Sequence, residues 1–111
     1  MAYIYIYTRA DAFNDGVLVD ISNIAQKVGF RCSVAVTDTV YNAVESAANP
    51  PFFTIDSTTL HILVMLKNTA GKESEILFDA ILPTGGVKLK AIAGPGDNGE
   101  MVVTIMYPEE D

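Results

Sequence analysis

The sequence has few of the residues from which many binding and catalytic sites are built. It contains one cysteine, one histidine and no tryptophan among 111 residues. The single Cys32 cannot form an intramolecular disulfide, which fits a reducing compartment, and we expect a cytoplasmic protein. The first residues lack the basic start and the apolar run of a signal peptide, so we expect none.

Basic residues are also scarce. Seven lysines and arginines stand against fourteen aspartates and glutamates, which gives a net charge of -7. Binding to phosphate groups depends on clustered cations. We therefore expect no direct contact with nucleic acid and none with an anionic membrane. The basic residues are scattered, at Arg9, Lys27, Arg31, Lys67, Lys72, Lys88 and Lys90.

Long hydrophobic runs are missing. The longest uncharged apolar run, residues 60–66, is far shorter than the roughly 20 residues that cross a bilayer, so we expect no membrane segment. Hydrophobic residues nevertheless make up 50% of the chain, enough to form a buried core. We predict a single domain over residues 1–111.

The first 20 residues divide into three predicted segments. Residues 2–8 alternate tyrosine with isoleucine, the period of two that is typical of a strand. Residues 9–16 are polar and end in glycine, which indicates a loop. Residues 17–20 read as a short extended piece.

Residues 21–48 read as helix, strand and helix. Apolar residues at helical spacing predict a helix over 21–28, which Gly29 can end in the left-handed conformation. Residues 30–37 alternate and predict a strand. Asp38 is a suitable N-cap for a second helix over 39–48.

The segment 54–71 fits two structures. Its apolar residues recur at helical spacing over a wide arc, as in a buried helix, while a strand over 60–66 is the alternative. The length of the segment favours the helix.

The C-terminal third predicts an antiparallel meander. Three strand-like segments, 73–82, 87–93 and 101–106, are separated by glycine-rich turns at 83–86 and 94–99. The sequence as a whole predicts an α+β fold, with a mainly antiparallel sheet of about five strands packed by two or three helices.

The same region carries a resemblance to a known family. Residues 89–100 (LKAIAGPGDNGE), 103–106 (VTIM) and 108–111 (PEED) resemble the ending of an uncharacterised family of short acidic-tailed proteins found on plasmids, phages and other mobile elements. Residues 15–20 (DGVLVD) and 34–37 (VAVT) are similar to its N-terminal half. Tyr41 stands where the family tends to have tryptophan. The resemblance implies a genetic neighbourhood and no mechanism.

Candidate catalytic residues are isolated. His61 lies among apolar neighbours, and no Gly-x-Ser-x-Gly motif accompanies it, so a small hydrolase using His61 is an alternative only. Cys32 reads as a buried hydrophobe on a strand rather than a nucleophile. We therefore expect no catalytic residue, although an enzyme is not excluded.

Two loops superficially suggest ligand binding. The series Asp11, Asn14, Asp15 and Gly16 fails the spacing of a calcium loop, because a carboxylate is missing at the twelfth position, Ser22. The turn 94–99 lacks the Gly-Lys-Ser/Thr ending of a phosphate loop and reads as a hairpin connection. We expect no metal and no cofactor.

Tyrosines and carboxylates are the best candidates for a partner-binding surface. Tyr3, Tyr5 and Tyr7 share one face of the predicted first strand, where they either bind a partner or cover the domain's own core. The carboxylates fall in two groups, and an evenly spread negative surface is the alternative to a single patch. The candidate carboxylates are Asp11, Asp15, Asp97, Glu100, Glu109 and Glu110.

The resemblance and the charge together predict a non-enzymatic accessory protein of a mobile element. We expect it to bind a host protein, such as a nucleic-acid-binding effector of a defence system, and to inhibit it by opposing carboxylates to a basic channel. Besides the hydrolase, a self-associating structural module that forms a homodimer is an alternative.

Overall fold

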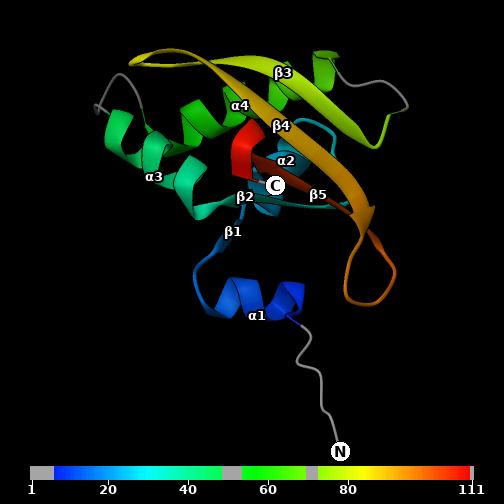
Figure 1. Cartoon of the computed structure of the whole chain (residues 1–111). Helices are drawn as coiled ribbons and strands as arrows, with labels where there is room; N and C mark the ends of the chain where they lie inside the picture. The colour runs from blue at the N-terminus through cyan, green and yellow to red at the C-terminus, as the bar shows by residue number, and fades with distance from the viewer. Residues whose placement is uncertain (1–6, 49–53, 70–72, 111) are drawn as a thin grey trace, which may run out of the picture.

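The computed structural model describes residues 7–48, 54–69 and 73–110 of the chain. These residues form one five-stranded sheet and four α-helices, which confirms the α+β fold (Figure 1). The elements, in chain order, are α1 (Arg9–Asn14), β1 (Leu18–Asp20), α2 (Ser22–Lys27), β2 (Ser33–Thr37), α3 (Asp38–Ala47), α4 (Ile55–Thr69), β3 (Glu75–Leu82), β4 (Gly85–Pro95), β5 (Met101–Met106) and the 3-10 helix η1 (Pro108–Glu110).

The strands lie in the order β1-β2-β5-β4-β3. The predicted meander is confirmed, because β3 pairs with β4 and β4 with β5 in antiparallel register. The turn at 94–99 therefore joins two neighbouring strands, as expected. The central pair, β2 and β5, is parallel, with Val34 opposite Val103 and Val36 opposite Ile105. The sheet is thus mixed but mainly antiparallel.

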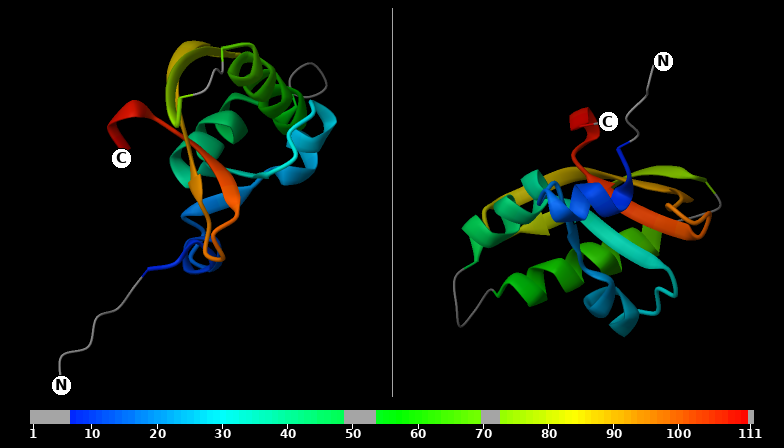
Figure 2. Two further views of the ribbon diagram at one scale, coloured as in Figure 1. Left: turned by 90° about the vertical axis from the view of Figure 1, so that its right-hand side faces the viewer. Right: turned by 90° about the horizontal axis from the view of Figure 1, so that it is seen from below.

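Helices α2, α3 and α4 cover one face of the sheet (Figure 2). Their apolar side chains meet those of the strands in a single cluster that includes Val34, Ile105, Ile62 and Leu63, each at most 1% exposed. Burying these aliphatic groups stabilises the fold by about 1.5–3 kcal/mol for each side chain. Of the described helices, α1 and η1 lie on the opposite face, where Arg9 contacts Thr104 and Lys90 contacts Pro108.

Helix α1 corrects the expectation of a loop over residues 9–16. The Thr8 hydroxyl accepts a hydrogen bond from the Asp11 backbone N–H, and the Asp11 carboxylate accepts one from the Thr8 N–H, which together form a capping box. The sequence motif Thr-x-x-Asp was present, but the polar composition around it favoured a loop. This helix raises the number of helices above the expected two or three.

The predicted strand over residues 2–8 lies mostly outside the described residues. Its last two residues, Tyr7 and Thr8, belong to no strand, and Thr8 is the N-cap of α1. The candidate residues Tyr3 and Tyr5 lie outside the described residues.

Within the segment 54–71, residues Ile55–Thr69 form a helix, as the length favoured, and the alternative strand over 60–66 is wrong. Thr54 and Ser57 begin α4 by exchanging hydrogen bonds between backbone N–H groups and side-chain oxygens at 3.0 Å.

Helix α3, predicted over residues 39–48, starts one residue earlier than expected, because Thr37 rather than Asp38 is its N-cap. Gly29, with φ +95°, follows α2 in the left-handed conformation, as expected.

Among the described residues, no helix has both the length and the apolar character needed to cross a membrane.

The predicted strand over 30–37 is shorter than expected, since β2 begins at Ser33.

Candidate functional site

Where α1 meets the β4–β5 hairpin, residues near the start of the sequence contact a loop near its end. The Asp97 carboxylate, in the hairpin loop, accepts hydrogen bonds from the backbone N–H groups of Arg9 and Ala10, both at 2.9 Å. These amides begin α1 and have no acceptor within the helix itself. A carboxylate at this position is favoured by the hydrogen bonds and by the helix dipole.

The Arg9 side chain runs from α1 onto the sheet. Its Nη1 donates to the Thr104 hydroxyl at 2.6 Å, and its Nη2 donates to the Val103 carbonyl at 3.2 Å. The guanidinium lies 5.5 Å from the centre of the Phe13 ring. Its Nε is buried and has no hydrogen-bond partner among the described residues.

Burial lowers the pKa of Arg9 from its ordinary value, while the neighbouring Asp20, Asp97 and Glu100 carboxylates oppose the shift. This partly buried cation therefore depends on surrounding carboxylates for compensation. Arg9 is a residue that the sequence reading did not select, and the capping motif after Thr8 was the signal that could have placed it on a helix.

A cavity of about 200 Å³ lies beside Arg9. It is smaller than the roughly 300–1,000 Å³ of typical small-molecule sites. The cavity is lined mainly by Arg9, Phe13, Ser33, Asp97, Glu100 and Val102. Its size and its mixed lining do not indicate a substrate pocket.

Four of the six candidate carboxylates lie on or beside α1. Asp11 and Asp15 are on this helix or at its end, Asp97 binds its first amides, and Glu100 acts electrostatically on Arg9. The hairpin loop therefore joins the N-terminal group, an arrangement that a single acidic patch requires.

These carboxylates are also held by hydrogen bonds within the protein. Asp15 accepts from the Tyr7 hydroxyl at 2.9 Å, and Glu100 accepts from the Asn98 backbone N–H at 3.1 Å. Tyr7 is 49% exposed, so its ring lies at the surface rather than in the core. Fixed carboxylates lose less conformational entropy on binding than free ones.

The tail carboxylates lie beyond the other end of β5. Glu110 Oε1 accepts hydrogen bonds from the Thr37 hydroxyl and from the Tyr107 backbone N–H, both at 2.9 Å. Glu109 is exposed. Burial raises the pKa of Tyr107, and the negative charges of Glu110 and Glu109 raise it further. A strand of six residues spans about 20 Å, so this group is distinct from Asp97 and Glu100.

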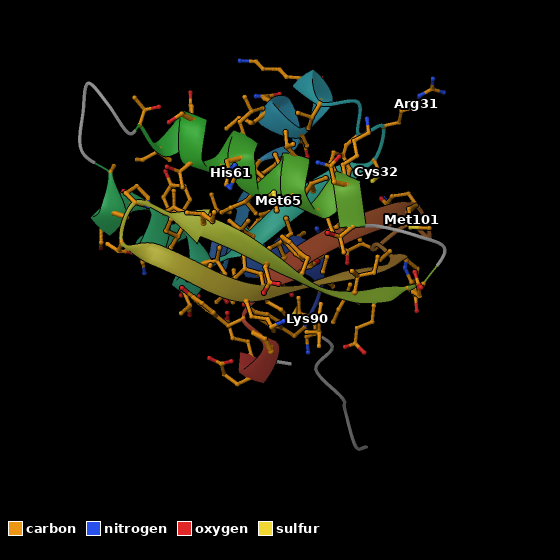
Figure 3. All side chains as sticks on the ribbon, turned by 90° about the horizontal axis from the view of Figure 1, so that it is seen from above. Arg31, Cys32, His61, Met65, Lys90 and Met101 are labelled. Atoms are coloured by element: carbon orange, nitrogen blue, oxygen red, sulfur yellow. The ribbon has the colours of Figure 1, made fainter. Side chains whose placement is uncertain are left out.

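His61 and Cys32 do not form a catalytic pair. His61, on α4, and Cys32, just before β2, lie apart in Figure 3, and His61 Nε2 is buried without a hydrogen-bond partner among the described residues. Within those same residues, no three histidine, cysteine or acidic side chains are grouped to hold a metal ion.

Lys90 is a buried cation that the sequence analysis did not single out. It is 5% exposed, and its Nζ lies 3.3 Å from the Pro108 carbonyl and 3.5 Å from Glu75 Oε1. Figure 3 shows it on the side of the sheet that carries η1, opposite His61. Its contacts attach η1 to the sheet, which makes its role structural.

Comparisons with protein-family models, with curated proteins and with solved structures give no match.

Proposed function

We propose that this chain is a non-enzymatic accessory protein of a mobile element that binds a host protein. The observation that carries the proposal is the attachment of α1 to the hairpin by Asp97, because it gathers Asp11, Asp15 and Glu100 around one short helix. The net charge of -7 and the family resemblance agree with it.

The partner that fits such a surface is a protein with a basic channel for nucleic acid. Carboxylates held in place can oppose lysines and arginines that otherwise contact phosphates, and this raises both specificity and the association rate. Binding there would inhibit the partner by excluding nucleic acid. The proposal places the protein in the host cytoplasm, where such effectors act.

The hydrolase alternative receives no support from the surroundings of His61, since the described residues place neither a nucleophile nor an orienting carboxylate on its buried Nε2. The self-associating module predicts a different result, a stable dimer at low concentration. Size-exclusion chromatography with light scattering separates it from the proposed host-binding protein.

The test begins with affinity capture from host lysate and identification of the partner by mass spectrometry. The captured partner is then titrated with Asp15→Lys and Glu100→Lys variants, whose side chains do not cap the start of α1. Matched controls are Glu45→Lys and Asp56→Lys, which reverse exposed charges on α3 and α4, across the sheet from α1.

The first pair should weaken binding by about tenfold or more at low salt, and the difference should shrink as salt is added. Glu109→Lys tests the tail group separately. Equal affinity for the wild type and for all of these variants at low salt would show that the acidic surface does not bind the partner.

A further inference from the structure

Strand β3 forms one edge of the sheet. It is eight residues long and pairs with β4, and no described strand lies on its other side. An edge of this length presents a row of backbone groups that can pair with another extended chain.

The hydrogen-bonding phase of β3 can be read from one contact. The Ser74 carbonyl accepts from the Ala93 N–H at 2.7 Å, so the backbone groups of Ser74 face β4. Because this direction alternates along a strand, the N–H and C=O groups of Leu77, Asp79 and Ile81 face away from β4. These are the groups that an added strand would use.

The same three residues carry their side chains on the face of the sheet away from α4. Leu77 is 54% exposed and Ile81 is 62% exposed, the two apolar side chains flanking Asp79. Asp79 lies directly opposite Lys88 of β4 and forms an ion pair with it at 3.2 Å. Along the edge itself, an acidic position therefore lies between two exposed apolar positions.

We propose that β3 is a docking edge for an extended segment of a partner protein. The segment pairs antiparallel with β3, with a basic residue opposite Asp79 and apolar residues opposite Leu77 and Ile81. The basic residue continues the alternation of charge that Lys88 and Asp79 begin, and the apolar residues cover exposed aliphatic surface. This edge is separate from the acidic surface around α1, so it goes beyond the proposed function.

A second copy of this chain fits the edge less well. The symmetric register that sets Leu77 against Ile81 of the other copy also sets the two Asp79 carboxylates against each other, and like charges directly opposite are destabilising. Each copy also carries a net charge of -7. The opposed Asp79 carboxylates and the negative charge of each copy both favour a cationic segment of another protein over a second copy of this chain.

The probe is a synthetic peptide, TVTKTVTKT, whose valines and first lysine take the positions opposite Ile81, Leu77 and Asp79. The control peptide has glutamate in place of both lysines. Binding is measured by calorimetry, and amide hydrogen exchange is followed by NMR in the full chain. The lysine peptide should bind about tenfold or more tightly than the control.

Exchange should slow selectively at the amides of Leu77, Asp79 and Ile81 and at the amide of Glu75, which faces away from β4 by the same alternation and lies opposite the second lysine of the peptide. The intervening amides already bond to β4. The Asp79→Lys variant should reverse the preference between the two peptides. Replacing the exposed Leu77 and Ile81 with threonine should weaken binding while leaving the fold intact. If Asp79→Lys does not fold, the peptide exchange on the wild type carries the test.

Three results would overturn this inference: absence of lysine-peptide binding, protection outside these four amides, or equal affinity for both peptides. Concentration-dependent protection of the same amides without peptide would identify a second copy as the occupant and would also overturn it. None of these results bears on the acidic surface around α1, so the two proposals fail independently.

Discussion

The Asp97 carboxylate accepts a hydrogen bond from the backbone N–H of Arg9, 88 residues earlier in the chain. The loop of a hairpin thereby caps a helix of six residues, a length at which an isolated helix is not stable in water. Helix α1 depends on this contact and on the capping box of Thr8 and Asp11. The predictions below test how the contact and its neighbours stabilise the protein.

Replacing Asp97 with alanine should lower the free energy of unfolding by about 1–2 kcal/mol, because two helix-starting amides lose their acceptor. Urea denaturation measures the change, and amide exchange should accelerate within α1 before the rest of the chain. Asn98→Ala, one residue along the same loop, serves as the control and should have little effect. Equal stability of Asp97→Ala and wild type would show that α1 is held by other contacts.

Arg9 and Thr104 should be energetically coupled, since Arg9 Nη1 donates to the Thr104 hydroxyl at 2.6 Å. A double-mutant cycle of Arg9→Met and Thr104→Val should give a coupling of about 1 kcal/mol. The two single changes are measured by urea denaturation with the double variant. Strict additivity would contradict a direct contact between these side chains.

Stability should fall at alkaline pH through Tyr107. Its pKa is raised in the folded protein from the ordinary 10.0, so above that pH the unfolded chain loses the phenol proton while the native chain keeps it. The stability that this group contributes is complete below pH 10.0 and is lost as the pH rises through the folded pKa.

The measurement compares wild type with Tyr107→Phe by urea denaturation between about pH 9 and 11. The stability of wild type relative to the variant should decrease over this range. Glu109→Gln removes one of the charges that raise the pKa and should reduce the decrease. A constant difference between wild type and Tyr107→Phe would contradict the shift.

His61→Leu should raise the free energy of unfolding by about 1 kcal/mol. The imidazole Nε2 is buried without a partner among the described residues, and an unpaired buried polar atom destabilises the fold. Thermal and urea denaturation check the change, with the neighbouring exposed Val64→Ala as a control. A clear loss of stability would show that the imidazole makes a favourable contact.

Local chemistry made several elements predictable. Gly29 ends α2 because glycine adopts a positive φ without strain, and its place after an apolar helical pattern is visible in the sequence. The glycine-rich turn at 94–99 predicted the β4–β5 hairpin, because glycine permits a tight turn and a short connection between two strand-like segments makes them neighbours in the sheet. The length of the segment that forms α4 favoured a helix over a strand, since it exceeds the usual length of a strand.

The candidate site was predictable only in its residue types. Asp11, Asp15, Asp97 and Glu100 stand out as acidic, but their spacing in the chain does not show that they lie near one another. The capping motif after Thr8 could have placed Arg9 on a helix, but nothing in the sequence indicated what its side chain contacts, because those contacts are β5 residues and the hairpin loop, far away in sequence.

The sequence by itself determined the composition, the acidity and those elements whose signals are local: helical spacing, alternation, caps and turns. Tertiary structure alone decided that β2 lies parallel to β5 and that Asp97 completes α1. Both are contacts between distant parts of the chain, and they form where burial of the whole sheet favours one arrangement over its rivals. A local pattern of residues does not show which arrangement of the whole sheet has the lowest free energy.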